Sequence, residues 1–194
     1  MKKIAVSAVV MATTAAFHAQ LSWAQSVEGV AGTATATAAA PIADARLAGQ
    51  GTLRFLGLEI YRARLWVQSG FQIDQYGAHP LALELAYQRD FTAEAIAKRS
   101  IEEMRRVGSF TPQQATRWQQ ALQTALPDVK RGDRLLGLYQ PGAGALFKMG
   151  GRVVGEAPDA EFARLFFGIW LSPQTSEPAL RQALTALART TAPP

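Results

Sequence analysis

The stretch LRFLGLEIYRARLWV, residues 53–67, is the strongest strand signal in this chain. It is rich in aromatic and branched side chains and contains no proline, so it predicts one long β-strand or two short ones. Gly57 interrupts the stretch and marks a bulge or a close approach of another backbone. If the strand were continuous, one face would carry Arg54, Leu56, Leu58, Ile60, Arg62, Arg64 and Trp66. The other face would carry Phe55, Tyr61 and Leu65.

Two interpretations of the three arginines in this stretch remain open. If helices cover the face of Arg54, Arg62 and Arg64, each guanidinium needs an anionic partner or faces a cleft. If the strand instead reverses its faces at Gly57, Arg62 and Arg64 lie in water, and Arg54 pairs with an Asp or a Glu.

The remaining strands and helices follow from the spacing of apolar residues. Residues 81–88 alternate large apolar side chains with small or polar ones, which predicts a half-buried strand. Two helical patterns come next, with Thr92 and Thr111 as N-caps and Pro112 at the first position of the second helix. Alternation then returns, and it predicts short strands over residues 134–140, 145–149 and 152–156.

Two further helical patterns close the chain, one from Asp159 and one from Ser176. Strands in two groups, with helices between and after them, are typical of an α+β fold. In such a fold an antiparallel sheet carries helices on one face. An aromatic stripe on the first of these two helices is expected in the core: Phe162, Phe166, Phe167 and Trp170.

Composition excludes several kinds of site. The chain has 194 residues, 48% of them hydrophobic, and its lack of cysteine excludes disulfides, thiolate metal ligands and cysteine nucleophiles. The two histidines, His18 and His79, are too few for a histidine-rich metal site, so we expect no metal and no cofactor. Fifteen of the 20 basic residues are arginines, which suits ion pairs and carboxylate recognition. They form no basic stripe, so we expect no nucleic-acid partner.

The N-terminus has the order of a secretory signal peptide. Lys2 and Lys3 precede an apolar run, and positions 22–24 (Ser-Trp-Ala) place small residues where a signal peptidase reads them. We expect cleavage after Ala24, a periplasmic or secreted protein, and no stable membrane anchor in the mature chain. An uncleaved anchor is the alternative, because the uncharged residues 4–27 are long enough to span a membrane.

The mature chain is expected to consist of a linker and one domain. Residues 25–44 are rich in Ala, Thr and Gly and have little to bury, which predicts a flexible linker. The domain would then cover residues 45–192. Within it, Gly49-Gln50-Gly51 is followed by a strand and by no Lys-Ser or Lys-Thr, so we expect a turn at the entry to the strand. Glu102 and Glu103 lie beside two arginines on a predicted helix, so we expect a solvated, self-paired face.

Taken in order, several segments resemble the chalcone isomerase-like superfamily over about residues 45–190, and the likeness is closest to its bacterial, exported branch. They are Gly49-x-Gly51-x-x-Arg54, Gly57-Leu58-Glu59-Ile60-Tyr61, Leu85-x-Tyr87-x-Arg89-x-Phe91 and the closing residues 162–173. The resemblance implies an open-faced β-sandwich. In that fold a large antiparallel sheet carries a layer of helices, with a cleft between them.

The resemblance implies one of two activities, because branches of the superfamily differ. Plant isomerases close a chalcone to a flavanone, and a strand Arg with ordered polar groups polarises the substrate. Another branch binds fatty acids in the same cleft and holds the carboxylate with an Arg and a Tyr. Carried over to this sequence, the Arg falls on Arg54, and Tyr61 and Tyr87 lie close by.

The polar set of the isomerases is mostly replaced in this chain. Their strand Thr falls near Leu56, their helical Tyr and Asn near Thr92 and Arg99, and their late-helix Thr near Leu165. The resemblance therefore favours a non-catalytic protein over an enzyme.

We accordingly expect a protein that binds a small amphipathic carboxylate, such as a fatty acid, in the cleft. The expected ligand-binding residues are Arg54, Tyr61 and Tyr87, with Arg54 as the anchor of the carboxylate. Two alternatives stay open. One is an intramolecular lyase of the chalcone–flavanone isomerase type acting on an enone, and the other is a structural or interaction role.

Overall fold

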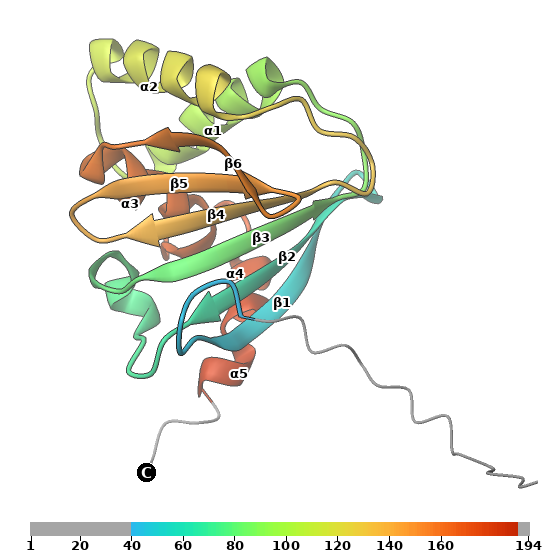
Figure 1. Ribbon diagram of the computed structural model, residues 1–194, viewed down its shortest axis with the longest axis vertical. Helices are drawn as coiled ribbons and strands as arrows, with labels where there is room; N and C mark the ends of the chain where they lie inside the picture. Colours follow the sequence, from blue (N-terminus) through green and yellow to red (C-terminus); the bar gives the residue numbers. More distant parts are fainter. Residues whose placement is uncertain (1–39, 190–194) are drawn as a thin grey trace, which may run out of the picture. The chain divides into compact units, whose positions relative to one another are not determined.

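The computed structural model describes residues 40–189, which form a six-stranded antiparallel sheet with helices (Figure 1). The predicted signal peptide, residues 1–24, and residues 25–39 of the predicted linker lie outside the described residues. The strands follow one another in the sheet in chain order: β1 (Arg46–Phe55), β2 (Leu58–Val67), β3 (Leu81–Tyr87), β4 (Arg134–Gln140), β5 (Gly144–Met149) and β6 (Arg152–Ala157). This meander confirms the predicted antiparallel sheet.

A layer of helices completes the fold. The helical elements are η1 (Ile73–Ala78, a 3₁₀ helix), α1 (Ala93–Val107), α2 (Pro112–Ala125), α3 (Ala160–Leu171), α4 (Pro178–Leu184) and α5 (Ala186–Arg189). In Figure 1, α3, α4 and α5 lie behind the strands, and α1 and α2 lie above them. None of the helices in residues 40–189 has the length and apolar character needed to cross a membrane. The arrangement confirms the predicted α+β class, an open-faced β-sandwich.

The helices begin close to where the sequence predicts, because side chains satisfy their first backbone N–H groups. The hydroxyl of Thr92 accepts from the N–H of Ala95 over 3.1 Å. Thr111 and Gln114 form a reciprocal capping box at the start of α2. At the C-terminus the single predicted helix is wrong, since the chain forms α4 and α5 as two separate helices.

Residues 53–67 form a β-hairpin and not one continuous strand. Leu56 and Gly57 make the turn between β1 and β2, and their φ angles are 49° and 78°. Two positive φ angles are the mark of the tight turn that matches the twist of a hairpin. The predicted assignment of side chains to the two faces of the sheet therefore holds along β2, but it does not continue through the turn into β1. A register shift after Leu53 displaces β1 further against β2.

Gly49 and Gly51 lie inside β1, which corrects the predicted turn at the entry to the strand. A Cβ on Gly49 would lie 2.6 Å from the carbonyl carbon of Leu184, and one on Gly51 would lie 2.7 Å from the side chain of Leu180. Side chains at these two positions would push α4 away from the sheet. The glycines therefore let α4 pack directly on β1.

The core lies between the sheet and α3. Ala63, Leu85 and Leu135 pair across neighbouring strands and are buried on the face that the helices cover. From α3, the rings of Phe162 and Phe166 stack with centroids 5.5 Å apart, as the aromatic stripe predicted. Near the β1–β2 turn this core opens into a cavity.

Candidate functional site

A cavity of about 440 Å³ lies between the sheet and the helix layer. β1, β2, β3 and β4 line one side of it, and α1, α3 and the segment before α4 line the other. Its lining is mostly apolar and includes Leu53, Ile60, Leu85, Leu126, Leu135 and Ile169. Small-molecule pockets have volumes of roughly 300–1,000 Å³ and similar apolar walls. The cavity therefore suits a small apolar or amphipathic molecule.

Tyr61 places a hydrogen-bond donor in this cavity. The indole Nε1–H of Trp170 donates to the hydroxyl oxygen of Tyr61 over 2.9 Å, and both residues line the cavity. Because an indole nitrogen can only donate, the proton of the Tyr61 hydroxyl remains available for another acceptor. Burial raises the pKa of Tyr61 well above that of an exposed phenol, so the hydroxyl stays neutral and keeps its proton.

Tyr87 adds a second hydroxyl next to the first. It pairs with Tyr61 across β2 and β3, the two ring centroids are 6.0 Å apart, and Tyr87 is 4% exposed. Its pKa is raised by burial, and its hydroxyl makes no hydrogen bond to any residue in the range 40–189. No fully enclosed polar side-chain atom in that range lacks a partner, so this hydroxyl keeps some accessible surface, and Tyr87 lines the cavity. A ligand oxygen could accept a hydrogen bond from it.

The helical wall carries a buried acid that the sequence did not predict. Glu103 of α1 has a side chain only 8% exposed, and its carboxylate lies 2.6 Å from Nη2 of Arg99 and 3.4 Å from Nε of Arg106. The hydroxyl of Ser176 donates to the same carboxylate over 2.7 Å. The prediction of solvation is therefore wrong for Glu103, although it does pair with arginines of its own helix; Glu102 lies at the surface and pairs with Arg99.

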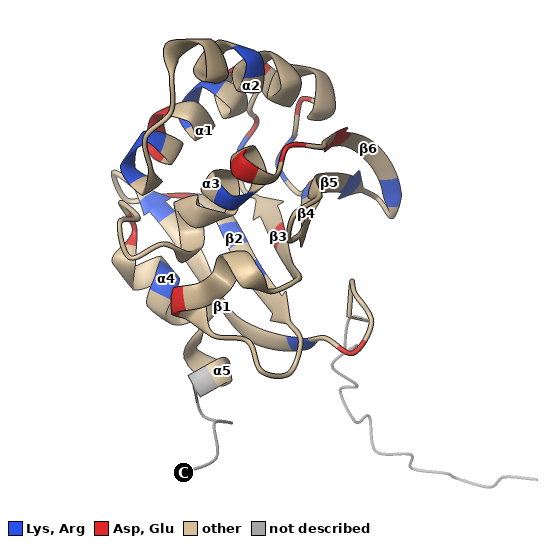
Figure 2. Ribbon diagram, turned by 90° about the vertical axis from the view of Figure 1, so that its left-hand side faces the viewer, with Lys and Arg blue, Asp and Glu red and all other residues tan. Residues whose placement is uncertain are grey.

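Arg99 is the basic side chain at the mouth of the cavity. Among the lining residues in the described part of the chain, it alone is basic. Its side chain is 65% exposed, and its two terminal nitrogens pair with Glu102 and Glu103. Basic and acidic residues are interspersed along α1 (Figure 2). A guanidinium has several N–H donors in a planar fork, so Arg99 can keep these partners and still meet an anion at the mouth.

Arg54, the predicted anchor, lies outside the cavity. Its side chain is 61% exposed, and its Nη2 lies 2.7 Å from Oε1 of Glu59, while Arg62 reaches Oε2 of the same residue at 3.3 Å. The hydrogen bond from Arg54 holds the pKa of the Glu59 carboxyl below its usual range. Arg64 lies 3.9 Å from Glu84. Of the two interpretations of the arginines, the one in which Arg54 pairs with an acid agrees with the structure. The position of Arg54 therefore does not support a role as the anchor of a ligand carboxylate.

The four positions onto which the isomerase polar groups fall do not form a polar site. Leu56 is 84% exposed at the β1–β2 turn, and Leu165 is fully buried in the core. The hydroxyl of Thr92 caps α1. Of the four, Arg99 alone lines the cavity. What the cavity offers a ligand is neutral hydroxyl donors, one guanidinium, the carboxylates of Glu103 and Glu177, and apolar walls.

Sequence reasoning did not identify three polar residues of this site. Glu103 follows Ser100 by three residues, and that helical spacing could have placed it on the inward side of α1. Trp170 was expected in the core, where an indole N–H needs a hydrogen-bond partner. Ser176 is predicted to open the last helix, but α4 begins only at Pro178, which leaves Ser176 in the segment before it.

Comparisons with known proteins agree with this fold. A family model described as chalcone isomerase-like matches residues 24–185. No curated protein matches the sequence. The crystal structure of a fatty-acid binding protein from Arabidopsis thaliana matches with a TM-score of 0.59 and 13% sequence identity, covering 77% of this chain and 91% of that chain. At this identity the match establishes the fold. Because the family model covers most of the sequence, the chain belongs to the chalcone isomerase-like family.

Proposed function

We propose that this protein binds one small amphipathic carboxylate, such as a fatty acid, in the cavity and does not transform it chemically. The observation that carries the proposal is the cavity of about 440 Å³, with its apolar walls, two tyrosines and a guanidinium at the mouth. The Arabidopsis thaliana protein of the same fold is a fatty-acid binding protein, which supports the same class of ligand here.

The apolar walls supply most of the binding free energy in this proposal. Burial of each methylene group contributes about 0.8 kcal/mol. About ten buried methylenes would contribute about 8 kcal/mol before the costs of association are subtracted. Leu85, Leu135 and Phe166 form the deeper part of this wall and are buried. An acyl chain fits such a surface better than a compact polar metabolite does.

The carboxylate of the ligand is assigned to the mouth, beside Arg99. Glu103 does not prevent this, because Arg99, Arg106 and Ser176 already pair with its carboxylate. The hydroxyl of Tyr61 has a proton to donate and lies in the same cavity. A charged donor and a neutral donor together are a common way to hold a carboxylate.

The isomerase alternative has less support than binding. Closing a chalcone requires polar groups that order a phenolate and an enone, and leucines stand at two of the corresponding positions, Leu56 and Leu165. Tyr61 and Tyr87 cannot act as phenolate bases near neutral pH, because burial raises the pKa of both.

Replacing Arg99 by Leu is expected to weaken binding of palmitic acid about tenfold or more, because a charge-assisted hydrogen bond contributes about 1.5–3 kcal/mol. Binding of the corresponding alcohol, which has the same chain and no charge, should change by less than about threefold. Calorimetric titration of each ligand into the wild type and the variant measures both effects.

Arg54→Leu is the matched control for this experiment. It removes an exposed guanidinium next to the hairpin turn, outside the cavity, and should leave both affinities unchanged. If Arg54→Leu abolished binding of the acid while Arg99→Leu had no effect, the assignment of the carboxylate to Arg99 would be wrong.

The proposal includes export of the protein, as in the bacterial exported branch that the sequence resembles. It rests on Lys2, Lys3 and the apolar run that precedes Ala24. The intact mass of the protein recovered from the cells that produce it is expected to correspond to a chain that begins at Gln25. A mass that still includes residues 1–24 would contradict cleavage at this site.

A further inference from the structure

The β1–β2 hairpin exposes an apolar tip beside the mouth of the cavity. This hairpin tip consists of residues 55–58, and the exposed fractions are 63% for Phe55, 84% for Leu56 and 47% for Leu58. These are three of the five large apolar side chains that are exposed in residues 40–188. Phe55 also lines the cavity, so the apolar surface of the tip continues into the cavity wall.

Leucine is an unfavourable residue for the position that Leu56 occupies. Its φ of 49° is in the left-handed region, where a tight hairpin turn favours Asn, Asp or Gly. Its side chain is almost fully in water. Neither backbone conformation nor hydration favours a leucine here, whereas contact with an apolar phase outside the protein would.

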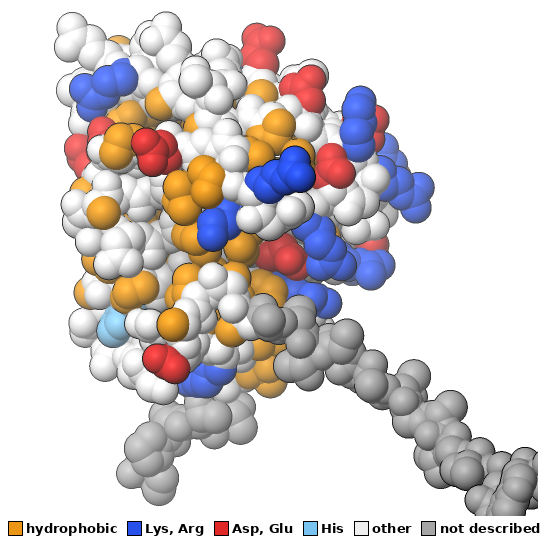
Figure 3. Space-filling model, in the orientation of Figure 1, with side chains coloured by type: hydrophobic (Ala, Val, Ile, Leu, Met, Phe, Trp, Pro, Cys, Tyr) orange, Lys and Arg blue, Asp and Glu red, His pale blue; other side chains and the backbone are white. Residues whose placement is uncertain are grey.

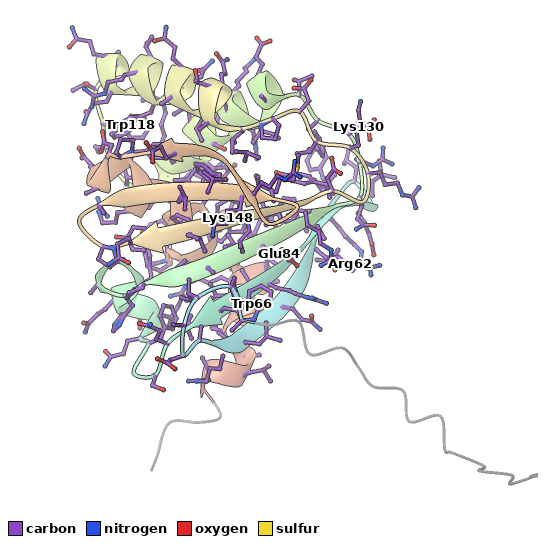
Figure 4. All side chains as sticks on the ribbon, viewed as in Figure 1. Arg62, Trp66, Glu84, Trp118, Lys130 and Lys148 are labelled. Carbon is purple, nitrogen blue, oxygen red and sulfur yellow. The ribbon has the colours of Figure 1, made fainter. Side chains whose placement is uncertain are left out.

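Basic residues surround this tip. Arg54 precedes it and Arg62 follows it, and both pair with the single carboxylate of Glu59, which leaves an excess of positive charge. Arg62 and Lys130 lie at the same end of the molecule (Figure 4), where basic side chains, with acidic ones among them, gather at the edge of the surface (Figure 3), and Lys130 pairs with Asp90 over 3.3 Å. Apolar side chains among basic ones complement a bilayer that has anionic headgroups.

We propose that the hairpin tip inserts into an anionic lipid surface and brings the mouth of the cavity to the bilayer. The identity of the transferred ligand rests on the proposed function, whereas docking is a separate property with its own readout. In this arrangement Leu56 and Leu58 enter the acyl boundary, and Arg54 and Arg62 remain among the headgroups. An acyl chain could then pass between bilayer and cavity along Phe55.

The absence of cysteine from the sequence allows a direct test of docking. An environment-sensitive fluorophore is attached to Leu56→Cys, and a matched control carries it at Val153→Cys. Val153 is 57% exposed on β6 and does not line the cavity. Vesicles of phosphatidylcholine with phosphatidylglycerol are expected to shift the emission of the label at position 56 to the blue and to leave the label at position 153 unchanged. High salt should reduce the shift, because it screens the arginines.

Three outcomes would overturn docking by the tip. These are no shift at position 56, equal shifts at both positions, and a shift at position 56 that depends on protein concentration without vesicles. The last would identify a second copy of the chain as the occupant of the tip. Because each label reports its own surroundings, membrane contact by another part of the chain cannot imitate the expected result.

A further variant separates docking from ligand binding. Leu56→Ser should weaken binding to the same vesicles roughly tenfold, because it removes one inserted apolar side chain. Its affinity for palmitic acid in vesicle-free buffer should equal that of the wild type. Unchanged vesicle binding by Leu56→Ser would overturn the docking proposal. Failure of the wild type to bind palmitic acid would instead overturn the proposed function.

Discussion

Replacing Ala95 by Trp is expected to weaken binding of palmitic acid at least about thirtyfold, because the indole would occupy the mouth of the cavity. Ala95 is exposed on α1 and lines the cavity, so a larger side chain there can fill the mouth without entering the core. An indole that displaces about three methylene groups of the ligand removes about 2 kcal/mol of binding free energy. Titration with the fatty acid measures the loss.

Lys98→Trp is the matched control for the blocked mouth. Lys98 lies on α1, is exposed, and does not line the cavity. The two variants add the same side chain to the same helix. A difference in their affinity for palmitic acid therefore reflects the blocked mouth and not a change in helix stability. Equal affinities of Ala95→Trp and the wild type would show that the ligand does not enter here.

The largest expected effect on stability comes from Phe162→Ala. Phe162 is fully buried, stacks on Phe166, and its ring centroid lies 5.9 Å from that of Trp118. Removal of a buried phenyl ring loses its burial and leaves a cavity, which typically costs about 3–5 kcal/mol. Since Phe166 lines the ligand cavity, loss of its neighbour should also loosen that wall. Chemical denaturation measures the free energy of unfolding.

Phe55→Ala makes the same substitution at an exposed position. The side chain of Phe55 is 63% exposed, so its removal should lower the free energy of unfolding by less than about 1 kcal/mol. A similar loss for both variants, or a loss below about 1 kcal/mol for Phe162→Ala, would contradict the core described here.

Much of the fold could be predicted because local patterns agree with the final structure. The alternation over residues 81–88 and 134–140 reflects strands with one buried face. The second strand has the expected bounds, and the first ends one residue early, at Tyr87. Thr92 and Thr111 cap helices as predicted, since their hydroxyls bond to nearby backbone N–H groups. The resemblance to a known family supplied the cleft between sheet and helices.

The place of Arg54 could not be predicted from periodicity. It depends on a turn at Leu56 and Gly57, and a leucine at the first position of a tight turn is no hairpin signal. Once the chain reverses there, Arg54 meets Glu59 across the hairpin and leaves the cavity to Tyr61 and its neighbours. When a stretch is treated as one continuous strand, alternation assigns its side chains to the correct face of the sheet only up to the point where the chain turns back.

The polar part of the site depends on tertiary contacts that have no local pattern. Its charged neighbours on α1 predict a solvated Glu103, but Ser176 and two arginines surround its carboxylate in the fold. Trp170 and Tyr61 are far apart in the sequence and meet because α3 packs on β2. Tyr61 and Tyr87 were named from the family resemblance, and both line the cavity.

Native mass spectrometry with added palmitic acid tests most directly whether the cavity is a fatty-acid site. The wild type is expected to bind one fatty acid per chain, Lys98→Trp to bind it equally, and Ala95→Trp to lose it. Failure of the wild type to bind palmitic acid, or equal retention of it by Ala95→Trp, would contradict the proposed site.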